Sequence, residues 1–152
     1  MPSRNAPPLV FFDASCLIAA AASPSGGSGL LLQIAQKGLI TAVISTAVLA
    51  EAERNLLAKF RPEALSHHRE QMAALSPIIA PIPRLDVEPR LYPEINPKDE
   101  HVIAAALVLG CDYLLTLDRP LLEQIESAQV PIVPLLPGDF IKQVLGPDAK
   151  RQ

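Results

Sequence analysis

Five short apolar runs, spaced widely along the chain, predict the strands of a β-sheet. They are rich in Leu, Ile and Val and are bounded by polar residues, Gly or Pro. The predicted strands are residues 9–12, 39–44, 78–82, 113–117 and 130–133. Because the runs are continuously apolar rather than alternating, both faces of the sheet should be buried, as in a parallel sheet.

Helical periodicity occupies most of the sequence between these runs. The predicted helices are residues 15–22, 30–37, 46–60, 63–75, 98–109 and 121–127. Gly38 and Gly110 stand just past the ends of two of them, where glycine commonly ends a helix. The Ser- and Gly-rich stretch 23–29 is predicted to be a loop, with Ser28 as the N-cap of the next helix. Strands alternating with helices predict a parallel sheet covered by helices on both faces.

Proline restricts the middle of the chain. Six prolines lie between residues 77 and 97, and proline cannot donate a backbone hydrogen bond to a neighbouring strand. The predicted strand 78–82 should therefore lie at an edge of the sheet.

The composition is that of one domain spanning residues 1–152, with its core at about 9–134 and a mobile tail at about 145–152. Apolar residues make up 49% of the sequence and aromatic residues 4%, so the core must be aliphatic. No apolar run approaches the roughly 18 residues of a membrane span, and the N-terminal segment is too short and too acidic for a signal peptide. Cys16 and Cys111 lack metal-ligand spacing and should be buried and reduced, which indicates a cytoplasmic protein.

The net charge distinguishes a simple nucleic-acid binder from a metal-dependent nuclease. A formal charge of −3 and a pI near 5.6 do not indicate the basic surface of a simple nucleic-acid binder. A nuclease that gathers carboxylates around a cation is compatible with this charge, because the cation reverses the local field where a phosphate binds.

Four carboxylates stand where a parallel α/β sheet binds its ligands, near the carboxyl ends of its strands. Asp13 follows the first predicted strand, and Asp118 ends the run LLTLD at the fourth. Asp99 lies near the start of the helix that leads into the fourth strand. Glu51 lies in the first two turns of the helix that leaves the second strand. Clustered carboxylates favour hard divalent cations such as Mg²⁺ or Mn²⁺.

Three segments that carry these acids resemble the acidic blocks of the PIN-domain family, in the same order. They read VFFDASCL, ISTAVLAEAERNL and NPKDEHVIAAALVLGCDYLLTLDRPLL, and the resemblance extends from about residue 9 to about residue 134. It matches the family's four acids with Asp13, Glu51, Asp99 and Asp118. The fold it implies is α/β: a three-layer α/β/α sandwich with a central, mainly parallel five-stranded sheet of Rossmann-like type.

The resemblance also implies a function, the hydrolysis of RNA phosphodiesters with one or two Mg²⁺ or Mn²⁺ ions, and hence an endoribonuclease. The four acids would hold the metal, and Ser15 and Thr116 match the hydroxyl positions that support them. Arg54, Lys98 and Arg119 are near the acids in sequence and are candidates to contact the RNA backbone. Many family members of this size are toxins paired with an antitoxin, and many are dimers, so a cognate antitoxin and a homodimer are expected partners.

Each acid also has an ordinary structural interpretation. Asp13 and Asp118 stand where they can cap the helices that follow them. Asn96 is the predicted N-cap of the next helix with Pro97 at its first position, which places Asp99 in the first turn whatever its function. Glu51 has the spacing to pair with Arg54, and periodicity does not separate Glu51 from Glu53.

Two other functions fit parts of the pattern. An Asp13-nucleophile phosphatase needs a second aspartate two positions later, where Ser15 stands. A non-catalytic PIN-like module that binds RNA or protein is compatible with the same fold. The adjacent His67 and His68 point about 100° apart on a helix, cannot easily share a metal, and are expected to be solvent-exposed.

Overall fold

The sheet is five-stranded and entirely parallel, with the strand order β3-β2-β1-β4-β5. The computed structural model of the protein describes residues 6–81 and 92–146. The strands are β1 (Leu9–Phe12), β2 (Thr41–Ser45), β3 (Ile78–Ala80), β4 (Tyr113–Leu115) and β5 (Val133–Leu135). At its centre Phe11 pairs with Val43 of β2 and Leu114 of β4, and all three side chains are fully buried.

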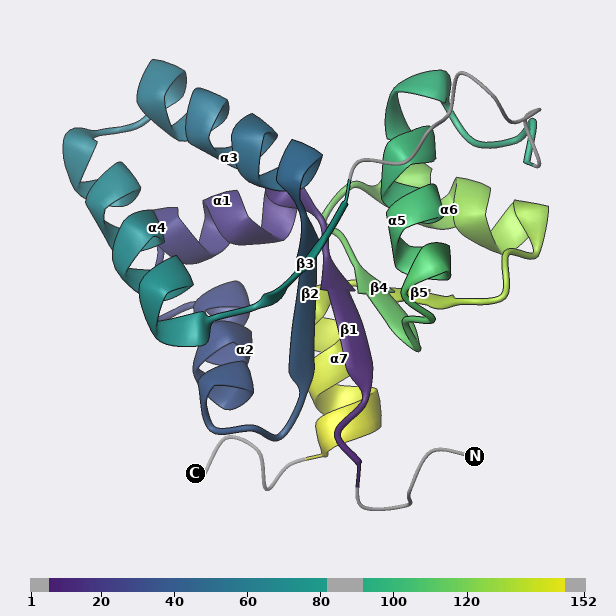
Figure 1. Ribbon diagram of the computed structural model, residues 1–152, viewed down its shortest axis with the longest axis horizontal. Coiled ribbons are helices and arrows are strands. Elements are labelled where there is room, and N and C mark those ends of the chain that lie inside the picture. The colour runs from purple at the N-terminus through teal and green to yellow at the C-terminus, as the bar shows by residue number, and fades with distance from the viewer. Residues whose placement is uncertain (1–5, 82–91, 147–152) are drawn as a thin grey trace.

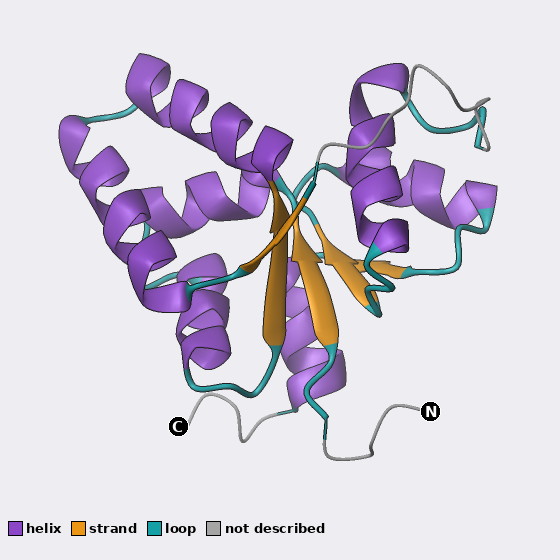
Figure 2. Cartoon of the chain, viewed as in Figure 1, coloured by secondary structure: helices purple, strands orange, loops and turns teal. Residues whose placement is uncertain are grey.

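Helices cover both faces of this sheet, which confirms the three-layer α/β/α sandwich. The α-helices are α1 (Ala14–Ala22), α2 (Gly27–Gln36), α3 (Thr46–Lys59), α4 (Pro62–Leu75), α5 (Glu100–Val108), α6 (Arg119–Ala128) and α7 (Pro137–Phe140). A 3₁₀ helix, η1 (Pro97–Asp99), precedes α5, and a π-helical turn, η2 (Ile141–Leu145), follows α7. Figures 1 and 2 show α1 to α4 on one side of the sheet and α5 and α6 on the other.

The strand predictions are confirmed in number and in sheet type, with displaced ends. As the prolines predicted, β3 lies at an edge and pairs with β2, and its Ile78 and Ile79 are exposed. The fifth strand begins at Val133, where the predicted strand 130–133 ends. Val130 and Ile132 are buried because they pack into the core, but they lie outside the ladder. An apolar run thus marks burial, which need not coincide with backbone pairing.

The predicted loop 23–29 is confirmed for residues 23–26 and wrong for 27–29, which are helical, and the predicted cap at Ser28 is wrong. Helix α2 begins at Gly27 with Gly26 as its N-cap, and Ser28 is buried inside the first turn. Gly29 explains why a glycine-rich stretch is helical here. A Cβ at that position would lie 2.0 Å from the carbonyl oxygen of Pro24, so the preceding loop can cross the helix only over a residue without a side chain.

The prediction for His68 is also wrong, because this side chain is 2% exposed. It faces inward from α4, and burial lowers its pKa. Its neighbour His67 is exposed as predicted, and its Nδ1 lies 3.2 Å from the carbonyl oxygen of Ala21 at the end of α1. Helix periodicity predicts which residues share a face, but it does not say how deeply one polar residue of that face is buried.

The remaining predictions concern the two cysteines, the C-terminal region and possible membrane spans. Cys16 and Cys111 are free and buried, as predicted. The helical segment 137–145, which contacts α2, was not predicted. The expected mobile tail falls mostly on residues 147–152, outside the described residues. In the described ranges no single helix is long and apolar enough to cross a membrane. The pair Ala14–Ala22 and Gly27–Gln36 meets that test only when joined across a 100° bend.

Candidate functional site

Asp13 lies at the centre of the candidate site, directly after β1 at the carboxyl end of the sheet. Its backbone N–H donates to the carbonyl oxygen of Leu115 (3.0 Å), which continues the pairing of β1 with β4. The side chain is 8% exposed. Its Oδ1 accepts from the N–H of Ala14 (2.8 Å), and its Oδ2 accepts from the hydroxyl of Thr116 (2.7 Å). Asp13 therefore caps α1, as its ordinary interpretation predicted, and is also hydrogen-bonded across the sheet.

Two hydroxyls join the turn after β1 to the turn after β4. Ser15 Oγ donates to Asp13 Oδ2 (3.3 Å) and accepts from the N–H of Leu117 (3.0 Å). Thr116 Oγ1 lies 3.4 Å from Ser15 Oγ and accepts from the N–H of Asp118 (3.0 Å). Ser15 and Thr116 thus hold the backbone that presents Asp118 against the carboxylate of Asp13. Both lie where the sequence predicted supporting groups.

Asp118 is the N-cap of α6, and Pro120 occupies the first turn of that helix. Its Oδ1 accepts from the N–H of Leu121 (3.1 Å), and the residue is half-buried. The capping interpretation is confirmed here too. Because the cap uses one carboxylate oxygen, the other remains available to a ligand.

Asp99 is the last residue of η1, a short helix organised by Asn96. The side chain of Asn96 accepts from the N–H of Lys98 (3.1 Å), and its carbonyl oxygen accepts from the N–H of Asp99 (2.9 Å). The N–H of Asn96 in turn donates to Oε1 of Gln124 on α6 (2.9 Å). The predicted N-cap at Asn96 is therefore confirmed.

The electrostatics of Asp99 connect it to the other two aspartates. Burial raises the pKa of the Asp99 carboxyl, and the negative charges of Asp13 and Asp118 raise it further, while Lys98 and His101 oppose the rise. The carboxylate of Asp99 is therefore close enough to Asp13 and to Asp118 to be repelled by both. Like charges held together in a half-buried site are unfavourable unless a cation joins them.

No described interaction links Glu51 to the three aspartates. It is half-buried in the second turn of α3, which Ser45 caps by accepting from the N–H of Val48 (3.1 Å). Its charge does not contribute to the shifted pKa of Asp99. Glu53 is exposed, and its charge acts on His68 of α4. The two glutamates thus have different surroundings, which periodicity alone did not distinguish.

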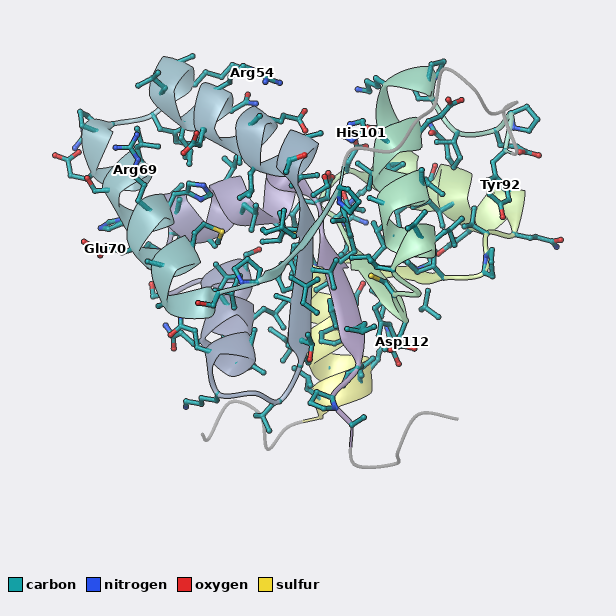
Figure 3. The ribbon with its side chains drawn as sticks, in the orientation of Figure 1. Arg54, Arg69, Glu70, Tyr92, His101 and Asp112 are labelled. Atoms are coloured by element: carbon teal, nitrogen blue, oxygen red, sulfur yellow. The ribbon has the colours of Figure 1, made fainter. Side chains whose placement is uncertain are left out.

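The three candidate cations differ in their relation to the acids. Lys98 is exposed and acts on the carboxyl of Asp99, and Arg119 is exposed at the first position of α6, next to Asp118. Arg54 is exposed on the outer side of α3 (Figure 3). Lys98 therefore acts on one of the acids and Arg119 is adjacent to another in the chain, but no described interaction links the side chain of Arg119 or Arg54 to the aspartates.

His101 and Gln124 belong to the site but were not predicted. His101 lies on the side of α5 nearer α3 (Figure 3), and its buried Nδ1 has no hydrogen-bond partner among the described residues. Its position two residues after Asp99 was a signal in the sequence. Gln124 gave no such signal, because its partner Asn96 is 28 residues away.

The chemistry of the donors fits a hard divalent cation, although no complete set of ligands is preformed. Carboxylate oxygens with neighbouring hydroxyls are the ligands that Mg²⁺ and Mn²⁺ prefer. Within residues 6–81 and 92–146, however, no three His, Cys, Asp or Glu side chains are grouped so that they could already hold a metal ion. Asp13 and Asp118 both make capping hydrogen bonds instead. Binding of an ion by three of these residues would therefore require side chains to turn toward it.

A family model described as a PIN domain matches residues 9–120, which contain all four predicted acids. No curated protein matches the chain.

Proposed function

The chain belongs to the PIN-domain family, whose members are generally metal-dependent nucleases, and we propose that it is a metal-dependent ribonuclease. The observation that carries the proposal is the effect of Asp13 and Asp118, at the carboxyl end of the sheet, on the pKa of the nearby Asp99. The pKa of the Asp99 carboxyl is raised by burial and by the negative charges of Asp13 and Asp118. Capping places Asp13 and Asp118 at the ends of neighbouring strands, but the Asp99 side chain makes no capping hydrogen bond, so capping does not account for its place near them.

The proposed metal ligands are Asp13, Asp99 and Asp118, with Glu51 as a ligand or as a group that orients a metal-bound water. Mg²⁺ or Mn²⁺, when bound, polarises a phosphate oxygen and lowers the pKa of a coordinated water. The chain's own contribution is orientation. Thr116 and Ser15 hold the carboxylate of Asp13 in one position through the bonds to its Oδ2. Such supporting bonds keep a ligand oriented and preserve its affinity for a metal.

The proposed substrate is RNA, cut at internal phosphodiesters. Lys98 and Arg119 are exposed beside the acids and are suited to contact the phosphates that flank the cleaved bond. Aromatic residues are few, so recognition by backbone charge is more suitable here than stacking of bases on aromatic rings. Action as a toxin controlled by a cognate antitoxin, and assembly as a homodimer, belong to the same proposal through the family.

A second candidate is a non-catalytic PIN-like module that binds RNA or protein. The observation that favours it is the lack of a preformed group of three metal-ligating side chains in the described residues. The two functions differ in turnover, since a binding module retains RNA without cutting it.

The test is cleavage of a panel of single-stranded and structured RNAs with Mn²⁺, Mg²⁺ or EDTA. Wild type is compared with Asp13→Asn and Asp99→Asn, with Asp112→Asn as the matched control. Asp112 is an exposed aspartate whose Oδ2 accepts from the N–H of Leu9, away from the three acids. We expect metal-dependent cleavage that both site variants lose and the control keeps. Cleavage that survives in both site variants would contradict the proposal, and RNA binding without cleavage would support the module.

A further inference from the structure

Asp99 reaches the other acids on a short and weakly self-supporting element. Helix η1 has three residues, and 3₁₀ helices of this length have poor hydrogen-bond geometry. Its first hydrogen bonds both converge on Asn96, from the N–H groups of Lys98 and Asp99. The position of Asp99 therefore depends on what fixes Asn96.

Two contacts fix the backbone at Asn96. The side chain of Ile95 is 1% exposed and belongs to the main core. The N–H of Asn96 donates to Oε1 of Gln124 (2.9 Å), 28 residues further along the chain. The buried Ile95 anchors the segment to the core, and the directional bond to Gln124 sets how Asn96, and hence η1, is oriented.

Gln124 lies on the same helix that Asp118 caps. Helix α6 begins directly after Asp118, and the bond from Leu121 N–H to Asp118 Oδ1 fixes that acid to the first turn. Gln124 follows six residues after Asp118, about 9 Å along a rigid helix. One helix thus holds Asp118 directly and holds Asp99 through Gln124 and Asn96, so the separation of the two acids is set by α6.

We propose that Gln124 is a positioning residue that holds Asp99 in register with Asp118 by accepting the N–H of Asn96. It does not contact either carboxylate. The inference builds on the proposed function, because it concerns the alignment of two proposed metal ligands. The hydrogen bond from Asn96 to Gln124 can nevertheless be tested without metal or RNA.

The test compares Gln124→Leu, which removes the acceptor, with Gln124→Glu, which replaces the amide oxygen by a carboxylate oxygen that can accept the same hydrogen bond. Ser127→Leu is the control, an exposed neutral residue on the same helix given the same apolar side chain. Two quantities are measured on the folded proteins: the amide hydrogen-exchange rates of Asn96, Lys98 and Asp99 without metal, and the dissociation constant for Mn²⁺.

For Gln124→Leu we expect amide exchange at Asn96, Lys98 and Asp99 to quicken. We also expect Mn²⁺ to bind about three- to tenfold more weakly, the factor that corresponds to loss of one neutral hydrogen bond. Gln124→Glu should restore both values toward wild type, and Ser127→Leu should change neither. Unchanged exchange in Gln124→Leu would overturn the inference, as would faster exchange with unchanged Mn²⁺ affinity. If wild type binds no Mn²⁺, the metal-dependent function is rejected, while the exchange rates still decide whether Gln124 holds η1.

Discussion

Replacing Thr116 by Val tests whether the hydroxyl network holds the candidate site together. The Thr116 side chain is fully buried, and its hydroxyl donates to Asp13 Oδ2 (2.7 Å) and accepts from the N–H of Asp118 (3.0 Å). Valine has almost the same shape and suits the end of a strand, so the change removes two hydrogen bonds without opening a cavity.

The size of the effect follows from these two bonds. A hydrogen bond to a charged group contributes about 1.5–3 kcal/mol, and a half-buried N–H left without a partner costs about 1 kcal/mol or more. The free energy of unfolding of Thr116→Val should therefore fall by about 2–4 kcal/mol. Thr116→Ser keeps the hydroxyl and loses one methyl group, which should cost only about 1 kcal/mol.

The measurement is urea unfolding of both variants and wild type at neutral pH in EDTA, with the slopes compared to verify two-state behaviour. EDTA removes any contribution from bound metal. Equal losses of stability in the Val and Ser variants would refute the reasoning, because the difference between them isolates the hydroxyl. A larger loss for Ser than for Val would mean that packing, and not hydrogen bonding, dominates at this position.

Three further predictions concern charge, burial and backbone space. Since burial raises the pKa of Asp99, its contribution to stability is present below its ordinary pKa of 3.8 and is lost as pH rises through the folded value. At pH 7 in EDTA, urea unfolding should therefore find Asp99→Asn more stable than wild type. Equal or lower stability of the variant would contradict this. Since burial lowers the pKa of His68, its contribution to the free energy of unfolding should be complete above about pH 6.5 and fall as pH drops toward the folded pKa. His68→Gln should flatten that part of the curve of stability against pH, measured by urea unfolding from pH 5 to 8. An unchanged slope in the variant would count against this. Gly29→Ala should lower the free energy of unfolding by about 1–3 kcal/mol, because its Cβ would meet the backbone of Pro24, whereas the matched Gly27→Ala meets nothing within 4 Å and should be neutral or stabilising.

The sequence predicted best those features that depend on local chemistry. The first strand, residues 9–12, was predicted residue for residue because a short apolar run ends at a charged residue. The caps at Asp13, Asn96 and Asp118 were predictable for the same reason, since a capping side chain bonds to backbone within three residues of itself. These local rules also placed three of the acids at element boundaries, and so at the edge of the sheet.

Features that depend on contacts between distant segments could not be predicted. The start of α2 at Gly27 requires the close approach of Pro24 to Gly29, which composition alone described as a loop. The burial of His68 depends on how α4 packs. The bond from Asn96 to Gln124 joins a loop to a helix that no periodicity relates. In each case the sequence contained the residues but not the distance between them.

The three aspartates are not equally compensated by the protein, and this difference has a consequence for metal binding. Asp13 accepts hydrogen bonds from Ala14 and from two hydroxyls, and Asp118 accepts one at the start of α6. No described hydrogen bond reaches the carboxylate of Asp99, and its pKa is raised. Asp99 is therefore the acid whose charge is least stabilised by the chain and most open to stabilisation by a cation. If the site binds Mn²⁺, the ion should stabilise the folded protein by mass action, and much of that stabilisation should disappear in Asp99→Asn even though the apo form of this variant is the more stable one.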